Sequence, residues 1–286
     1  MKGIVLAGGR GTRLYPTTKA VSKQLLPIYD KPMIFYPIAT LMAAGIREIL
    51  IITTPEDQHL FKRLLGNGQK IGVTFEYAIQ EYPNGLAEAL IIGKRFAQET
   101  SVALILGDNI FHGTGLGREL SKFKDVEGAQ IFAYEVANPQ EYGVIEFAES
   151  GEIISIVEKP QIPKSKFAVP GLYFYDSSVY EFVENIQPSE RGELEITTLN
   201  EKYLSEGLLH ASILPRGTTW FDTGTFESLQ DAGNYVRILE SRQNLRVACL
   251  EEISWRLGWI TTDQLHTLAN SSENTGLKSY LLNLIE

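Results

Sequence analysis

The first segment able to do chemistry is a glycine loop, Leu6-Ala-Gly-Gly-Arg-Gly-Thr-Arg-Leu14, which directly follows a short apolar run. Glycines let backbone N–H groups approach an anion because no Cβ atom intervenes. Arg13 and Lys23 place two cations near the loop, an arrangement that suits a triphosphate. A tight turn between a strand and a helix is the alternative. The loop is neither a P-loop, which ends in Gly-Lys-Ser/Thr, nor a dinucleotide-binding Gly-x-Gly-x-x-Gly, because Leu14 occupies the last glycine position.

Two aspartates that follow apolar runs are candidate ligands for Mg²⁺. Asp108 stands in Leu106-Gly-Asp-Asn109, and Asp222 stands in Trp220-Phe-Asp-Thr-Gly224. Mg²⁺ prefers one or two carboxylates together with phosphate oxygens, so an aspartate at the carboxyl end of a strand can hold it against a phosphorylated substrate. The alternatives are an ordinary turn at Asp108 and, at Asp222, an N-cap for a helix that begins near residue 225.

A third charged segment is Val157-Glu-Lys-Pro160, preceded by Tyr142-Gly143. In this segment Glu158 can bind sugar hydroxyls and Lys159 can bind a phosphate. A surface ion pair of little consequence is the alternative. A sugar phosphate that acts as the nucleophile needs no general base, because the second pKa of a phosphate is about 6. Such a reaction needs cations and accurate positioning instead.

Other kinds of chemistry lack their residues in this chain. The four histidines show no metal-ligand spacing, and no Gly-x-Ser-x-Gly segment is present. The single cysteine, Cys249, excludes an internal disulfide framework and a Cys-based zinc cluster. Acyl transfer and zinc-dependent hydrolysis are therefore disfavoured.

The candidate residues need a scaffold, and the first two-thirds of the chain alternate short apolar runs with helical patterns. In a helix over 55–65 we expect Leu60, Leu64 and Leu65 to face inward. Continuous apolar strands separated by helices are typical of a parallel sheet covered on both faces, and ligands of such sheets bind at the carboxyl ends of the strands. The pattern predicts strands at 3–7, 48–53, 73–77 and 102–106, and further helices at 34–44 and 86–98.

From about residue 128 the pattern changes to strand-like runs separated by Gly, Pro and Asn. We expect these runs to extend the same sheet and to form an insertion on the substrate side. They lie at 130–136, 143–147, 153–157 and 168–175. A long amphipathic helix is predicted over 225–242, followed by short helical patterns over 247–286.

The expected fold is therefore α/β and Rossmann-like, with a mostly parallel sheet covered by helices. Residues 1–245 are expected to form the catalytic domain, including the sugar-binding part, and residues 246–286 a C-terminal helical appendage.

The composition disfavours two classes of partner. The 286 residues carry 26 Lys and Arg against 35 Asp and Glu, and this formal net charge of −9 is poorly suited to nucleic acid or anionic lipid. The apolar run near Met1 is too short for a signal-peptide core, and no run approaches the length of a membrane span. We expect a soluble cytoplasmic protein that acts on small molecules.

Together these motifs resemble those of the glucose-1-phosphate thymidylyltransferases, a branch of the sugar-nucleotide pyrophosphorylases. The most specific stretch joins Gly8-Gly-Arg-Gly-Thr-Arg-Leu14 to Ser22-Lys-Gln-Leu-Leu-Pro27 and Lys31-Pro-Met33, and the resemblance runs on to the C-terminus. It implies that glucose 1-phosphate attacks the α-phosphorus of dTTP with Mg²⁺, giving dTDP-glucose and pyrophosphate. This reaction is the first step of dTDP-rhamnose-type sugar biosynthesis.

The resemblance also implies roles for individual residues. Arg13, Lys23, Asp108 and Lys159 are the implied catalytic residues, with Arg13 stabilising the departing pyrophosphate and Lys159 gripping the phosphate of the sugar. Asp108 and Asp222 are the implied Mg²⁺ ligands. The implied nucleotide-binding residues are Gly8, Gly11, Thr12, Arg13, Lys23, Gln24, Gln80, Gly85 and Asp108. The implied sugar-phosphate-binding residues are Asn109, Gly143, Glu158, Lys159 and Val169. A homotetramer and an allosteric dTDP-sugar inhibitor at a second site are implied as well.

Some positions depart from the pattern of that family. Arg10 replaces a small hydroxyl residue, Glu81-Tyr82 replaces the commoner Pro-Lys, and Glu88 replaces the commoner Gln. Arg10 adds a cation near the triphosphate, whereas the two glutamates add negative charge beside the base pocket. A uridylyltransferase or another sugar-1-phosphate nucleotidyltransferase is the alternative within the class. A non-catalytic regulatory subunit that binds nucleotide sugars is the alternative outside it, but no cation or carboxylate of the expected set is missing.

Overall fold

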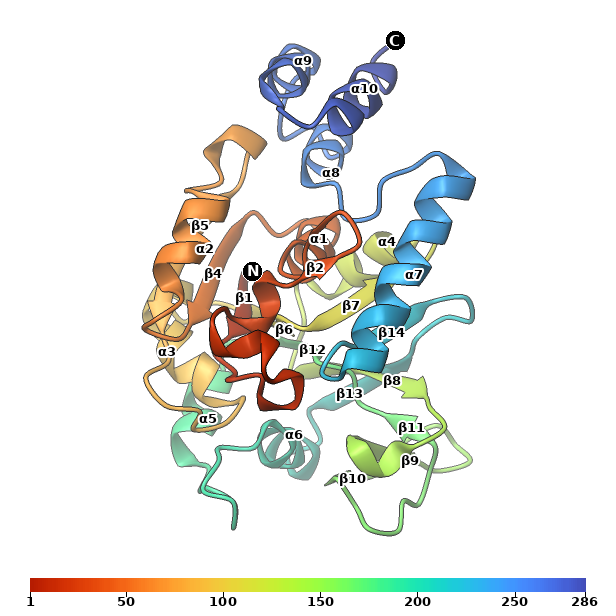
Figure 1. Cartoon of the computed structure of the whole chain (residues 1–286). Helices are drawn as coiled ribbons and strands as arrows, with labels where there is room; N and C mark the ends of the chain where they lie inside the picture. Colours follow the sequence, from red (N-terminus) through yellow and green to blue (C-terminus); the bar gives the residue numbers. More distant parts are fainter.

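The computed structural model describes residues 1–286 and contains a ten-stranded mixed sheet (Figure 1). Four parallel strands form one end of this sheet, which confirms the strands predicted there. In spatial order they are β5 (Thr74–Ile79), β4 (Glu48–Thr53), β1 (Lys2–Ala7) and β6 (Val102–Leu106).

Strands β1, β4 and β6 are largely apolar on both sides because helices cover both faces of the sheet. On β1, Ile4 and Leu6 join one core cluster, and Val5 and Ala7, which point the opposite way, join another. The first cluster includes side chains of α3 (Glu88–Ala97), α5 (Val179–Asn185) and α6 (Ile196–Ser205). The second includes side chains of α1 (Phe35–Ala43), α2 (Gln58–Leu65) and α4 (Leu116–Leu120). The predicted helix-covered sheet is confirmed.

Helix α2 buries a different face from the one predicted. Phe61 is fully buried, Leu60 and Leu65 are half-buried, and Leu64 is 39% exposed. Helix α2 packs on β5, which is the last strand at this edge of the sheet. Only the stripe around Phe61 therefore meets the core, and the prediction that Leu64 faces inward is wrong.

Beyond β6 the sheet continues with antiparallel strands, as expected. In spatial order these are β12 (Leu172–Tyr175), β8 (Ala129–Glu135), β11 (Phe167–Ala168), β9 (Gly143–Phe147) and β10 (Ile153–Glu158). The sequence did not predict β13 (Leu209–Ile213), which pairs with β8 in parallel. The single strand predicted over 168–175 is wrong, because Pro170 has no N–H to donate and the chain divides there into β11 and β12.

Two small two-stranded sheets lie apart from the main one. In one of them β7 (Asn109–His112) pairs with β14 (Thr219–Asp222) and sets Asn109 opposite Asp222. In the other, β2 (Pro27–Ile28) pairs with β3 (Lys31–Pro32) and lies against α7 (Phe226–Gln243). The long helix predicted over 225–242 is thus confirmed as α7, and Thr225 rather than Asp222 caps it.

The C-terminal residues form three short helices at one end of the molecule (Figure 1). They are α8 (Leu250–Arg256), α9 (Thr262–Ser271) and α10 (Thr275–Asn283). Helix α8 packs on α1, whereas α9 and α10 enclose a small cluster around Leu265 and Leu281. No helix in the chain combines the length and apolar character needed to span a membrane.

Candidate active site

The strand order places a binding position beyond β1 and β6. From β1 the chain builds β4 and β5 on one side, then returns to form β6 on the other side. Open α/β sheets bind ligands at such a switch point, beyond the carboxyl ends of the strands. The glycine loop follows β1, and Gly107-Asp108 follows β6, where the Gly107 N–H donates to the Leu6 carbonyl at 2.9 Å.

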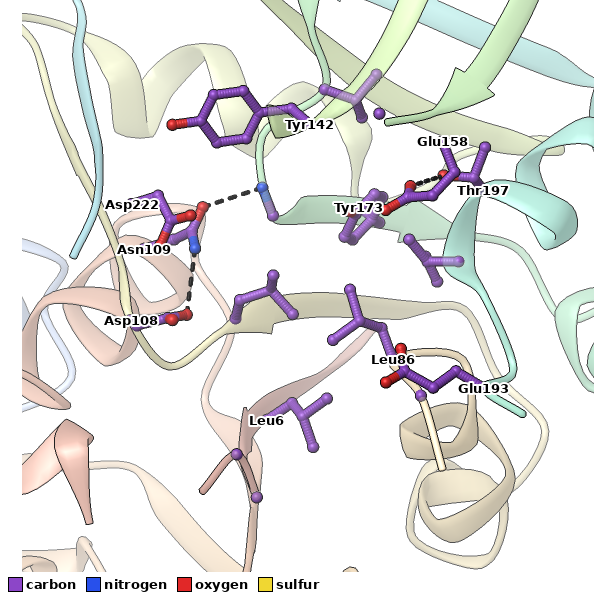
Figure 2. A pocket seen from close by; sticks show the side chains of 18 of the residues that line it. Leu6, Leu86, Asp108, Asn109, Tyr142, Glu158, Tyr173, Glu193, Thr197 and Asp222 are labelled. Carbon is purple, nitrogen blue, oxygen red and sulfur yellow. Dashed lines mark hydrogen bonds between the residues drawn. The ribbon is translucent and has the colours of Figure 1, made fainter. Parts of the chain in front are cut away.

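A cavity of about 300 Å³ opens at this point (Figure 2). In the close-up, Asp108, Asn109 and Asp222 lie on one side of the cavity and Glu158 and Thr197 on the other. The implied site residues in its wall are Gly8, Arg13, Lys23, Gln24, Gln80, Gly85, Asp108, Asn109, Gly143, Glu158, Lys159, Val169 and Asp222.

Two implied residues, Gly11 and Thr12, are not part of this wall. Gly11 has φ of +60° and precedes a single 3₁₀ turn, Thr12–Leu14, with Thr12 exposed. A positive φ favours glycine, and the Thr18 hydroxyl donates to the Gly11 carbonyl at 2.7 Å. The structure therefore gives Gly11 a role in shaping the loop.

The glycine loop packs tightly against the far wall of the cavity. A Cβ atom on Gly8 would lie only 2.4 Å from Oε1 of Gln80, so this position has room only for glycine while Gln80 keeps its place. Gln24 is 1% exposed, and the Ser22 hydroxyl donates to its Oε1 at 2.6 Å. These contacts fix two amide side chains beside the loop.

The charged centre of the cavity combines Lys23, Asp108 and Asp222. Lys23 Nζ forms an ion pair with the carboxylate of Asp108. Burial acts to raise the pKa of Asp108, but the ammonium of Lys23 prevails and holds it below its usual range. Burial first, and then repulsion from Asp108, raises the pKa of Asp222 to about 6.

Arg13 closes this side of the cavity. A Cβ atom on Gly224 would lie 2.6 Å from a guanidinium nitrogen of Arg13, so the arginine reaches the turn that follows Asp222. Arg13 forms no ion pair with any carboxylate of the chain, whereas Lys23 does. Its guanidinium therefore stays available for an anionic ligand.

The donor set fits Mg²⁺ better than it fits a metal held by protein alone. No group of three or more His, Cys, Asp or Glu side chains is placed to hold a metal. Mg²⁺ uses one or two carboxylates and takes its other oxygens from substrate phosphates and water. Asp108 and Asp222 could supply these carboxylates, and a cation would relieve the repulsion that raises the pKa of Asp222.

The opposite wall presents a polar cradle around Glu158. The Thr197 hydroxyl donates to Glu158 Oε2 at 2.6 Å, and Lys159 Nζ lies 3.6 Å from Oε1. Lys159 adopts a positive φ of 41°, a strained conformation for a residue with a side chain, while its N–H donates to the Tyr142 carbonyl at 3.0 Å. The Val169 N–H bonds to the Gly143 carbonyl at 2.8 Å, which brings both residues to the cavity edge.

Asn109 is oriented by two donors. Its Oδ1 accepts from Trp220 Nε1 at 2.6 Å and from the Gly171 N–H at 3.0 Å. Its Nδ2 must therefore face the cavity side, where it lies 3.3 Å from Oδ1 of Asp108. The break between β11 and β12 supplies Gly171, so the irregular backbone there serves the site.

Several residues in or next to this wall were not predicted from the sequence. Thr197 and Asn200 come from α6, Tyr173 comes from β12, and Arg191 has a guanidinium nitrogen 3.6 Å from Glu158 Oε1. The helical spacing of Ile196, Leu199 and Tyr203 is a signal that could have revealed α6. No local signal marks Arg191, because only the fold brings it to Glu158.

Residues 2–237 match the sequence model of the family described as "Nucleotidyl transferase". The chain belongs to the nucleotidyl transferase family. This nucleotidyl transferase is 55% identical over 286 residues to the glucose-1-phosphate thymidylyltransferase of Mycobacterium tuberculosis, covering 100% of this chain and 99% of the relative. It is 53% identical to the enzyme of the same name from Neisseria meningitidis, covering 100% of both chains.

Solved structures show the same fold as this nucleotidyl transferase. A putative glucose-1-phosphate thymidylyltransferase from Bacillus anthracis, crystallised with a sucrose, aligns with a TM-score of 0.77 at 41% identity, over 83% of this chain and 95% of that one. A UDP-glucose pyrophosphorylase complexed with UDP-glucose aligns with a TM-score of 0.73 at 26% identity, over 83% of this chain and 98% of that one. The Rossmann-like α/β fold expected from the sequence is confirmed.

Proposed function

We propose that this nucleotidyl transferase moves a thymidylyl group from dTTP to α-D-glucose 1-phosphate, releasing pyrophosphate. One observation carries the proposal. A single cavity joins the glycine loop and Gln80 to the Glu158–Lys159 segment, with Arg13, Lys23 and two carboxylates in its wall. A transferase that brings two phosphorylated substrates together needs this arrangement. The relatives named glucose-1-phosphate thymidylyltransferase support the same assignment.

The proposed chemistry is an in-line displacement. A phosphate oxygen of glucose 1-phosphate attacks the α-phosphorus of dTTP, and the bond from that phosphorus to the bridging oxygen of pyrophosphate breaks. The sugar phosphate is already largely dianionic at neutral pH, since its second pKa is about 6, so no side chain has to remove a proton. Catalysis then comes from positioning and from cations that neutralise the developing charge.

Different residues of the cavity would bind the two substrates. Lys159 and Glu158 would hold the phosphate and the hydroxyls of the sugar, with Asn109, Gly143 and Val169 around them. Gly8, Gln24, Gln80 and Gly85 would hold the nucleotide. Arg13, which has no carboxylate partner, would stabilise the pyrophosphate as it leaves. Lys23 would both contact the phosphates and compensate Asp108.

Mg²⁺ is the proposed cofactor, and Asp108 and Asp222 would hold it. When bound, it supplies positive charge to the phosphate oxygens at the reacting centre. Asp222 is suited to recruit it, because Lys23, Arg13 and Lys159 only partly offset the burial and the repulsion from Asp108 that raise its pKa to about 6.

UTP is the specific alternative to dTTP. The likeness to a UDP-glucose pyrophosphorylase complexed with UDP-glucose favours it. One methyl group in a pocket changes binding by only about 1–3 kcal/mol, so this choice is a preference rather than a barrier. A regulatory subunit that only binds nucleotide sugars is disfavoured, because the cavity retains every cation and carboxylate of the proposed chemistry.

Several finer parts of the proposal rest on the sequence resemblance alone. They are a homotetrameric assembly, inhibition by a dTDP-sugar at a second site, a cytoplasmic location, and a place as the first step of dTDP-rhamnose-type sugar biosynthesis. Size-exclusion chromatography with light scattering tests the tetramer, and inhibition kinetics with dTDP-sugars test the second site.

The deciding experiment for the activity is a matrix of sugar 1-phosphates against dTTP and UTP, read by pyrophosphate release. We expect glucose 1-phosphate with dTTP to give the highest kcat/KM. A higher kcat/KM with UTP would move the assignment to a uridylyltransferase, and no release with any pair would remove it.

A further inference from the structure

The side-chain amide of Gln80 is held in one orientation. Gln80 is only 4% exposed, and its Nε2 donates to the Gly85 carbonyl at 3.1 Å and to Glu88 Oε2 at 2.7 Å. Both partners can only accept hydrogen bonds, and the amide has only two N–H donors. The two donors are therefore used within the protein, and the amide cannot be turned over without placing its oxygen against two acceptors.

The opposite atom of the amide stays free. Oε1 of Gln80 receives no hydrogen bond from the protein and is not fully buried, and Gln80 lines the cavity. It lies directly beside Gly8, where a Cβ atom would come within 2.4 Å. The atom that Gln80 offers to a ligand here is therefore an acceptor.

Glu88 is itself fixed before any ligand arrives. It is the first residue of α3, where the helix dipole favours a carboxylate, and Asn84 Nδ2 donates to its Oε1 at 2.8 Å. The neighbouring backbone is clamped as well, because Leu194 donates to the Asn84 carbonyl at 2.6 Å and accepts from the Ala87 N–H at 3.1 Å. The carboxylate thus acts as a rigid acceptor for Gln80.

We propose that Glu88 is a positioning residue that makes Gln80 an obligate acceptor and so selects the base of the nucleotide. An acceptor at this position pairs with the N3–H of thymine or uracil. Cytosine presents an unprotonated N3 there, and the two acceptors would repel each other. This inference rests on the proposed use of Gln80 for the base. On this inference Glu88 determines whether the site binds a pyrimidine that donates a hydrogen bond at N3 or one that accepts a hydrogen bond there. Glu88 need not touch the nucleotide to do so.

The test replaces Glu88 with an amide of the same shape. In Glu88→Gln the new side chain can donate as well as accept, so only the Gly85 carbonyl still opposes turning the amide of Gln80 over to present its nitrogen. We expect the ratio of kcat/KM for dTTP over dCTP to fall about tenfold, which corresponds to about 1.4 kcal/mol. The dTTP over UTP ratio and the KM for glucose 1-phosphate should stay within twofold of wild type, because both bases carry an N3–H.

A matched control distinguishes the effect of the Gln80 amide orientation from the effect of removing a negative charge. Glu81→Gln removes the same charge from an exposed position in the same segment, and Glu81 makes no hydrogen bond to Gln80. It should leave the dTTP over dCTP ratio unchanged. Glu88→Ala, which removes the acceptor, should lower the ratio as Glu88→Gln does.

Calorimetric binding of dTTP and dCTP without sugar phosphate measures the same discrimination independently of turnover. An unchanged binding ratio and an unchanged kcat/KM ratio in both Glu88 variants would overturn the inference. Lost discrimination in binding, together with a wild-type protein that forms no dTDP-glucose, would support the inference and remove the proposed function instead.

Discussion

Lys23, in the segment after the glycine loop, forms an ion pair with Asp108 beyond the end of β6, and their side chains are only 13% and 11% exposed. The pair joins the two loops that meet at the switch point of the sheet. It also presets a carboxylate that is ionised, because the lysine lowers the pKa of Asp108 against the effect of burial. The cation and the proposed metal ligand are thus one structural unit.

Removing the ammonium group of Lys23 should lower the stability of the protein as well as its turnover rate. In Lys23→Met the side chain keeps its bulk, but Asp108 becomes a buried charge without a partner. We expect the free energy of unfolding to fall by about 3 kcal/mol, measured by urea denaturation at pH 7.5. The double variant Lys23→Met/Asp108→Asn should recover most of that loss. Equal stability of wild type and Lys23→Met would show that the pair is not coupled.

Substitutions of Arg13 and Lys159 should change different kinetic constants. Lys159→Ala mainly raises the KM for glucose 1-phosphate, since the lysine would hold that substrate before and during reaction. Arg13→Ala mainly lowers kcat, because charge builds on the departing pyrophosphate only as the bond breaks. Steady-state kinetics with pyrophosphate detection checks both. Wild-type turnover in both variants would refute these roles.

The bond between Thr197 and Glu158 should matter for the sugar rather than for the nucleotide. Thr197→Val keeps the shape but removes the hydroxyl that donates to Glu158 Oε2 at 2.6 Å. A hydrogen bond contributes about 1 kcal/mol, so we expect the KM for glucose 1-phosphate to rise about fivefold. The KM for dTTP should not change. A rise in the KM for dTTP alone would place Thr197 at the wrong substrate.

The sequence was sufficient for the parallel strands and for several charged residues of the cavity wall, but not for Glu141, Glu193 or the neighbouring Arg191. In the runs at Glu48–Thr53 and Val102–Leu106 every buried residue except Thr53 is apolar, so the local sequence is enough to predict buried strands. Asp108 could be predicted because it follows a buried strand, where open α/β sheets bind ligands, and Arg13 and Lys23 because they flank a glycine loop.

The remaining features depend on contacts between distant segments. Asp222 reaches the site because β14 pairs with β7, and neither of these short strands could be predicted from four residues. The hydrogen bonds that hold the Gln80 amide in one orientation could not be predicted for the same reason. A sequence shows an amide and a carboxylate eight positions apart, but only the packed segment shows which atom of the amide each partner takes.

Asp222 should destabilise the metal-free protein at neutral pH. Burial and Asp108 raise its pKa from 3.8 to about 6, so between these values the folded state holds a proton that the unfolded chain has lost. Its contribution to stability therefore falls as pH rises through this window, and the full cost is present above pH 6. In EDTA, the free energy of unfolding of Asp222→Asn should exceed that of wild type by about 3 kcal/mol at pH 7.5, with the two converging near pH 4. Urea denaturation measures this, with Asp231→Asn on the exposed face of α7 as the control. A variant that is no more stable than wild type at pH 7.5 would show that Asp222 is not held under repulsion for a cation to relieve.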